Sequence, residues 1–219
     1  MNAVQYFFNE LPPCNKKEIL RYSGCGNSKD QQNISDLVDE CIKEAEQVLK
    51  CSLCYIRLPL SINGSLCSIG DISVESADLA KHLDGCDSVV VFAATVGIGL
   101  DRLIAKHGKL SPSKGLILQA IGAERIESLC DAFCQSLEDE YKTLTQRFSP
   151  GYGDLSLEAQ RDIFNVLGCH KIGITLNDSL IISPSKSVTA IIGIGGKCRT
   201  NQNKCDKCNN LNCEYRGRK

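Results

Sequence analysis

Two short stretches of the sequence concentrate residues that could do chemistry. The first is Arg-Phe-Ser-Pro-Gly-Tyr-Gly-Asp over residues 147–154. Its proline and glycines enforce a backbone that neither a helix nor a strand adopts, so a ligand can approach the chain closely. Arg147 suits carboxylate recognition, because a planar guanidinium can donate two parallel hydrogen bonds to a carboxylate. On composition alone, a plain connector with a surface arginine is the alternative.

The second stretch is a polar tail rich in lysine, asparagine and cysteine, residues 196–219. Almost no other apolar residue accompanies its thiols, so they cannot all be core side chains. Four thiolates at such short spacing can bind a zinc ion or an iron–sulfur cluster, and the spacing leaves both open. A tail with free thiols is the alternative. The four candidate metal ligands are Cys198, Cys205, Cys208 and Cys213.

Composition narrows the class of protein. The 219 residues suit one large domain, residues 1–195, with the cysteine-rich tail as a small appendage. A net charge of −1 gives no basic field, so we expect neither a nucleic-acid partner nor a membrane partner. The sequence has no export signal and no apolar run long enough to span a bilayer, which predicts a cytoplasmic protein with reduced thiols.

Hydrophobic periodicity predicts the elements that must position these residues. Helices and strands do not alternate strictly, which favours an α+β fold over a doubly wound one. The run Val-Val-Val-Phe-Ala-Ala within residues 88–94 is typical of a central, fully buried strand. We expect helices at residues 16–22, 33–50, 76–83, 98–107, 113–145 and 156–167, and strands at residues 54–60, 65–69, 88–94, 173–176, 179–182 and 188–194.

Several segments together resemble a known family. The segment at residues 147–154 is followed by Pro-Ser-Lys-Ser-Val-Thr at residues 184–189. Upstream lie Arg-Tyr-x-Gly at residues 21–24, Val-Phe-Ala-Ala-Thr-Val-Gly at residues 91–97 and Gln-Ala-Ile-Gly-Ala-Glu at residues 119–124. Over residues 15–195 the chain is similar to the activation domain of cobalamin-dependent methionine synthase, and more completely to free-standing proteins of that family. The resemblance implies a twisted mixed or antiparallel sheet with flanking helices.

The resemblance also implies a site. Domains of this family bind S-adenosylmethionine in a shallow groove beside the corrin ring. Arg147 matches the arginine that contacts the ligand carboxylate, and Glu127 matches the carboxylate that faces the ligand ammonium, with Glu124 as the alternative in register. Tyr152 matches the tyrosine near both the ligand and the cobalt, which makes it the catalytic candidate. The implied ligand-binding residues are Glu127, Arg147, Ser149, Gly151 and Tyr152, and the implied corrin-facing residues are Lys186 and Ser187.

The implied function is that of an S-adenosylmethionine-binding activator. It would support reductive remethylation of cob(II)alamin on a separate methionine synthase, with the cobalamin-binding module as partner and an external reductant such as flavodoxin or ferredoxin. This chemistry favours an iron–sulfur cluster over zinc in the tail. It needs no general base, which fits the scattered positions of His82, His107 and His170.

Two other functions stay open. The fused enzymes continue Pro-Ala-Cys-Pro after the tyrosine, whereas this chain reads Gly-Asp-Leu-Ser at residues 153–156. One alternative is therefore a non-catalytic module that binds a corrinoid protein. The other is an iron–sulfur reductive activator of other corrinoid methyltransferases, with the tail as its working part.

Overall fold

The computed structural model describes residues 4–7, 12–26 and 31–195, and it has the predicted α+β architecture. Its main sheet is antiparallel, in the order β4-β3-β2-β5-β8, and β1 pairs with β2. The elements are β1 (Gln5–Phe7), α1 (Lys16–Tyr22), α2 (Gln31–Glu46), β2 (Ser52–Asn63), β3 (Leu66–Ile69), β4 (Ile72–Glu75), α3 (Ala77–His82), β5 (Ser88–Thr95), α4 (Ile98–Leu110), α5 (Pro112–Glu140), α6 (Ala159–Leu167), η1 (Cys169–Ile172), β6 (Thr175–Leu176), β7 (Ile182–Ser183) and β8 (Ser187–Ile194).

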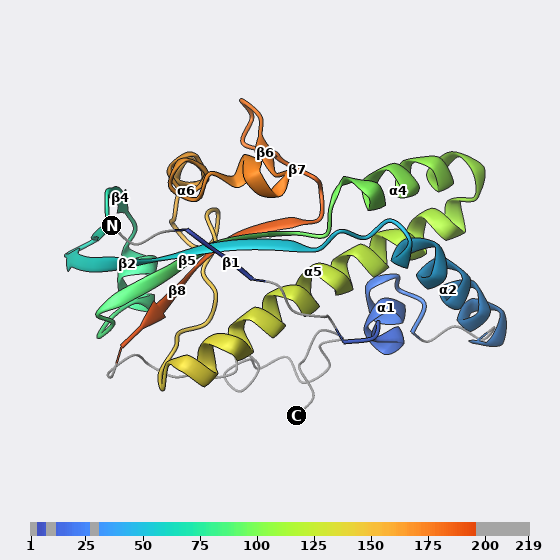
Figure 1. Ribbon diagram of the computed structural model, residues 1–219, viewed down its shortest axis with the longest axis horizontal. Helices are drawn as coiled ribbons and strands as arrows, with labels where there is room; N and C mark the ends of the chain where they lie inside the picture. The colour runs from blue at the N-terminus through green and yellow to red at the C-terminus, as the bar shows by residue number, and fades with distance from the viewer. Residues whose placement is uncertain (1–3, 8–11, 27–30, 196–219) are drawn as a thin grey trace.

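Strand β5 is central, as its continuous apolar sequence predicts. It pairs along its whole length with β2 on one edge and β8 on the other, and all eight of its residues are buried. Side chains alternate between the faces of a strand. Phe92 therefore packs in a core with α1, α2, α4 and α5, whereas Val91 packs in a second core with α3, α6 and η1. Figure 1 shows α6 above the strands and α5 beneath them.

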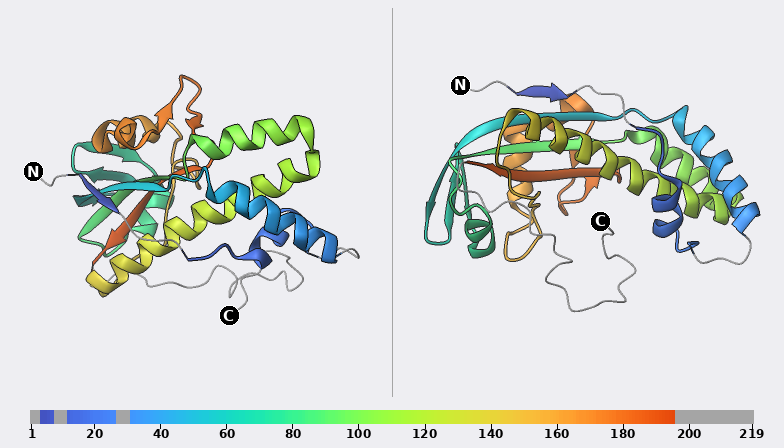
Figure 2. Two further views of the ribbon diagram at one scale, coloured as in Figure 1. Left: turned by 45° about the vertical axis from the view of Figure 1, so that its right-hand side comes forward. Right: turned by 90° about the horizontal axis from the view of Figure 1, so that it is seen from below.

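The long helices extend well past the sheet. Figures 1 and 2 show α2, α4 and the first half of α5 projecting beyond one end of the strands. Helices α4 and α5 form a hairpin that turns at Ser111, with Pro112 in the first turn of α5. Proline suits that position because the first N–H groups of a helix have no intrahelical partner. The second half of α5 then runs back along the sheet.

The structure corrects several predicted boundaries. The helix predicted to reach residue 145 ends at Glu140. The chain then runs beside β8: the Thr145 N–H donates to the Gly193 carbonyl at 3.0 Å, and Phe148 exchanges two backbone hydrogen bonds with Ile191. Strands β1 and β4 were not predicted, and β7 begins at Ile182 rather than at residue 179.

Two further sequence predictions concern the cysteine-rich tail and membrane-spanning segments. The tail, residues 196–219 with Cys198, Cys205, Cys208 and Cys213, lies outside the described residues, so its role stays a prediction. Within the described ranges, no helix combines the length and the apolar character that crossing a membrane requires.

Candidate functional site

A cavity of about 680 Å³ lies where the second half of α5, the chain after it and the start of β8 come together. Four predicted site residues line it: Glu127, Arg147, Ser149 and Tyr152. The corrin-facing candidate Ser187 lines it as well. Residues separated by 60 positions therefore share one concave surface, which is a common arrangement for small-molecule sites.

Arg147 is the one cation on the described wall of this cavity, and two carboxylates of α5 neutralise it. Its Nη2 donates to Glu127 Oε2 at 2.9 Å and to Asp131 Oδ1 at 3.0 Å. The side chains of Arg147, Glu127 and Asp131 are 27%, 45% and 72% exposed. Water and solutes can therefore reach the carboxylates, so these ion pairs can exchange with a ligand.

Asp131 was not predicted as a site residue. It follows Glu127 by four positions, and residues at that spacing lie on the same face of a helix. The spacing of these acidic residues was therefore an available signal. Arg147 itself is positioned by tertiary pairing, because the adjacent Phe148 is bonded to β8 on both backbone groups.

The segment after Arg147 has a fixed backbone. Gly151 has φ of +88°, which L side chains rarely adopt, and its N–H donates to the Leu155 carbonyl at 2.8 Å. Leu155 is buried in the core shared with α3 and α6. Gly151 is exposed and lies off the cavity wall; its place in the site is to set the turn that leads to Tyr152.

Asp154 ties the same segment to α3. Its carboxylate accepts from the Ser76 hydroxyl and from the backbone N–H groups of Ala77 at 2.9 Å and Asp78 at 3.2 Å. These hydrogen bonds, the one from Ser76 foremost, hold the pKa of Asp154 below its usual value. The Gly-Asp sequence that departs from the fused enzymes thus anchors the loop to the first turn of α3.

Tyr152 stands at the rim of the cavity. Its side chain is half exposed, and its ring makes an edge contact with Phe148 at a centroid distance of 6.1 Å. Phe148 in turn packs on His82, whose Nε2 lies 2.7 Å from the Gln146 carbonyl oxygen. An aromatic ring presented in this way offers a flat apolar surface beside the charged groups.

Two cysteines lie close to Arg147, but neither is a thiolate at neutral pH. Burial raises the pKa of Cys130 to about 12 and that of Cys134 to about 11, against the opposing effect of Arg147. Cys134 lines the cavity and Cys130 is buried. A protonated thiol is a poor nucleophile, so neither cysteine is the candidate nucleophile of this cavity.

Lys186 is not among the residues that line the cavity, although the adjacent Ser187 is. A Cβ added at Gly122 of α5 would lie 2.9 Å from its Cγ, so the lysine stem packs on α5. Burial lowers the pKa of Lys186, while the charge of Asp101 opposes that shift. Its corrin-facing role stays a prediction.

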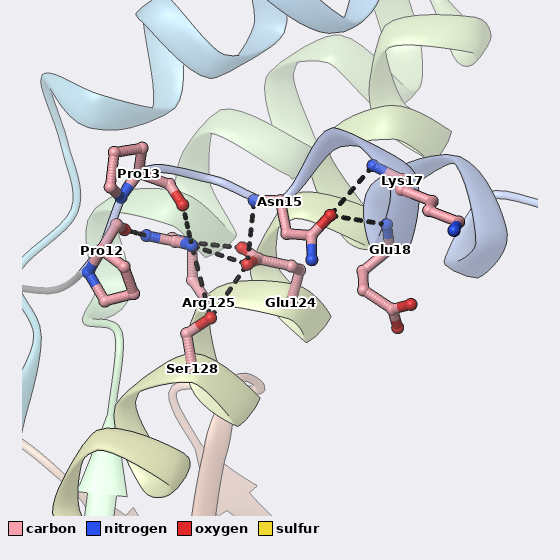
Figure 3. Close-up of polar contacts among 8 residues, drawn as sticks. All are labelled: Pro12, Pro13, Asn15, Lys17, Glu18, Glu124, Arg125 and Ser128. Atoms are coloured by element: carbon pink, nitrogen blue, oxygen red, sulfur yellow. Dashed lines mark hydrogen bonds and ion pairs between the residues drawn. The ribbon is translucent and has the colours of Figure 1, made fainter. Parts of the chain in front are cut away.

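A second cavity, about 460 Å³, shares Glu127 and Asp131 with the first and lies between α5 on one side and α1 with the segment that leads into it on the other. Figure 3 shows what holds that segment. Arg125 donates to the carbonyl oxygens of Pro12 at 2.7 Å and Pro13 at 3.4 Å, and Glu124 accepts from the Asn15 N–H at 3.1 Å. We call these groups, with Ser128, the N-terminal clasp.

The two acidic candidates of α5 have different surroundings. Glu124 is 4% exposed and Arg125 is 6% exposed, and the Ser128 hydroxyl completes the set by donating to Glu124 at 2.9 Å. Glu124 is therefore occupied by the protein itself. Glu127, one turn further along, is the carboxylate beside Arg147.

Among the described residues, no three histidine, cysteine, aspartate or glutamate side chains are grouped so that they could hold a metal ion. His107 is buried with Nε2 at 2.7 Å from Glu44, which makes it part of the packing between α4 and α2.

Comparison with known proteins supports the fold. No family model matches the chain, and no curated protein matches it. Among solved structures, it is similar to the MetH reactivation domain bound to AdoHcy, with a TM-score of 0.66 and 13% sequence identity. The likeness covers 91% of this chain and 80% of that one. Identity this low shows the architecture alone: the chain has the fold of the MetH reactivation domain.

Proposed function

We propose that this protein is an S-adenosylmethionine-binding activator that supports reductive remethylation of cob(II)alamin held by a separate cobalamin-dependent methionine synthase. The observation that carries the proposal is the pairing of Arg147 with Glu127 on the wall of one cavity. The solved structure with the same fold has AdoHcy, the demethylated form of that ligand, bound to it.

The donor set fits the amino-acid end of the ligand. A free amino acid carries a carboxylate and an ammonium on the same carbon atom, so it can insert between a guanidinium and a carboxylate. The ligand carboxylate would replace Asp131 on Arg147, and its ammonium would bind Glu127. The carboxylates of α5 engage only Nη2 of Arg147, whereas a guanidinium has five N–H donors, so the exchange does not require the Glu127 contact to break.

The remaining residues would position the rest of the ligand. Tyr152 offers a ring at the rim, and Ser149 borders the cavity beside it. Bound S-adenosylmethionine would supply the methyl group, and an external reductant such as flavodoxin or ferredoxin would supply the electron. The protein's own contribution is proximity and orientation, which can lower a barrier by about 7–11 kcal/mol in favourable cases.

Calorimetry tests the binding step directly. The full chain should bind S-adenosylmethionine and S-adenosylhomocysteine, and Arg147→Ala should weaken both by roughly 10- to 100-fold, because a charge-assisted hydrogen bond contributes about 1.5–3 kcal/mol. Arg147→Lys should recover only part of the loss, since lysine lacks the planar fork. Arg161→Ala is the matched control: Arg161 is an exposed arginine that is paired with Glu158 and does not line the cavity.

The non-catalytic binding module is the second candidate, and the neutralised state of Arg147 favours it. If both carboxylates stay on Arg147, the cavity has no free cation for a ligand carboxylate. A corrinoid protein would then bind the chain, while neither sulfonium nor thioether ligand would. That pattern in the same titrations would replace the activator proposal.

The tail proposal rests on the sequence alone. We propose that Cys198, Cys205, Cys208 and Cys213 bind an iron–sulfur cluster that relays the electron, with zinc as the alternative. Iron and zinc analysis of anaerobically purified protein, with its visible absorption spectrum, separates the two. Colourless protein loaded with zinc would end the relay and leave the binding site at Arg147 unaffected.

A further inference from the structure

A third cavity, about 610 Å³, lies on the other side of β5 from the Arg147 site. It borders β2, whereas the Arg147 cavity borders β8, and the two have no lining residue in common. Three cations from separate elements line it: Lys50 before β2, Arg102 on α4 and Lys171 on η1. Among the described residues, no carboxylate lines this cavity. In Figure 1, η1 is the short turn between α6 and β6.

The three cations have no carboxylate partner within the described ranges, unlike most of the arginines considered so far. Arg21, Arg125, Arg147 and Arg161 each form an ion pair with a carboxylate. In the described part of the chain, Lys50, Arg102 and Lys171 form none, and all three are exposed. Like charges that converge without a counter-ion raise the potential inside a hollow and attract an anion.

Close packing between the chain before β2 and the start of α4 fixes the floor of this cavity. A Cβ at Gly99 would lie 2.4 Å from the Val48 carbonyl oxygen, so only glycine lets the chain before Lys50 rest on the start of α4. The Lys50 N–H donates to the Val96 carbonyl at 3.0 Å. The first turn of α4 carries one carboxylate, Asp101, which does not line the cavity and accepts hydrogen bonds from Ser185.

Apart from Ser52, the rest of the wall is formed by apolar, aromatic and glycine residues. Ile98 is 45% exposed and Tyr6 is 39% exposed, and both line the cavity together with Ile172. Its volume lies within the range of about 300–1,000 Å³ that is usual for small-molecule sites. The cavity thus combines a cationic side with a surface on which a flat or apolar group can rest.

We propose that this cavity is a second binding site, for a phosphate-bearing ligand of the nucleotide class. Its phosphates would contact Lys50, Arg102 and Lys171, and its base would lie against Tyr6 and Ile98. S-adenosylmethionine does not suit the cavity, because it has no phosphate and carries a positive sulfonium. The site goes beyond the proposed activation role and does not depend on it.

Calorimetric titration of the full chain with ATP tests the site, with pyrophosphate and adenosine as part-ligands. ATP should bind more tightly than either part, and added salt should weaken its binding. Arg102→Ala and Lys171→Ala should each reduce ATP affinity about tenfold or more, since each removes a charge-assisted contact. Lys106→Ala is the matched control, an exposed lysine on α4 that does not line the cavity.

Absence of ATP binding would overturn the proposal. A loss of ATP affinity in Lys106→Ala as large as that in Arg102→Ala would also overturn it, because it would indicate unspecific charge attraction. Pyrophosphate binding as tightly as ATP would overturn the nucleotide assignment. The two sites are tested separately: Arg147→Ala should leave ATP binding unchanged, and Arg102→Ala should leave S-adenosylmethionine binding unchanged. Failure of one pair of measurements therefore leaves the other standing.

Discussion

Two sets of ion pairs lie within two turns of α5, and their surroundings are opposite. Glu124 and Arg125 are 4% and 6% exposed, and the backbone of residues 12–15 uses their remaining hydrogen-bonding groups. Glu127 and Asp131 are 45% and 72% exposed, and their cation comes from Arg147, beyond the end of the helix. The buried set holds the chain together, whereas the exposed set can exchange partners with a ligand.

Under the proposed function, one helix serves two purposes. A charged group that is buried away from water needs hydrogen-bond partners from the protein, and the N-terminal clasp supplies them. Charged groups at a cavity wall are screened by water, so little free energy is needed to separate an ion pair there. Substitutions in the clasp should therefore change stability, and substitutions around Arg147 should change binding.

The largest expected effect is on the clasp. Arg125→Ala leaves the Glu124 carboxylate buried without its cation and frees two proline carbonyls, so unfolding free energy should fall by about 3–5 kcal/mol. Urea denaturation measures the change. The double variant Glu124→Gln/Arg125→Met, which removes both charges, should lose less than Arg125→Ala. A loss below about 1 kcal/mol in Arg125→Ala would show that the clasp is not a structural centre.

Arg147→Ala should change ligand binding more than stability, the reverse of what is expected for the clasp. Its pairs are partly exposed, so we expect a loss of about 1 kcal/mol or less in unfolding free energy, alongside the large loss in S-adenosylmethionine binding. Both quantities are measured on one preparation, by urea denaturation and by calorimetry. Large destabilisation with unchanged ligand affinity would assign Arg147 a structural role like that of Arg125.

Substitutions of the two carboxylates that pair with Arg147 should have opposite effects on ligand affinity. Glu127→Gln should weaken S-adenosylmethionine binding about tenfold, because the ligand ammonium loses its charged partner. Asp131→Asn should strengthen binding by a few-fold, because the competitor of the ligand carboxylate has lost its charge. Parallel titrations of the two variants measure the difference. Equal weakening in both would mean that Asp131 positions Arg147 instead of competing for it.

The smallest expected effect concerns Asp154, whose pKa is lowered mainly by the Ser76 hydroxyl. A carboxyl with a depressed folded pKa stabilises the fold above its unfolded pKa, near 3.8, and this contribution is lost as pH falls through the lower folded value. Asp154→Asn should thus lower the melting temperature slightly at neutral pH. The gap to the parent protein should close in strong acid; a gap independent of pH would rule out the charge as its source.

Local sequence was sufficient for the elements whose patterns are strong. The apolar run at residues 88–94 predicted the central strand, because a short apolar run rich in valine is typical of a strand with both faces buried. The predicted helix at residues 16–22 matches α1, with Asn15 as its cap. The short strand β1 carries no pattern of its own. Its pairing with β2 comes from tertiary contact, so sequence reasoning missed it.

For the site, the sequence determined the chemistry and the fold determined the geometry. The composition of residues 147–154 and the resemblance it carries were enough to single out Arg147. The sequence left Glu124 and Glu127 as alternatives, because three positions along a helix is within the error of register. Only packing against the segment before α1 buries Glu124, and only the pairing of Phe148 with β8 brings Arg147 to Glu127. Sequence fixes which groups are present, but long-range contacts decide which of them face water and which face each other.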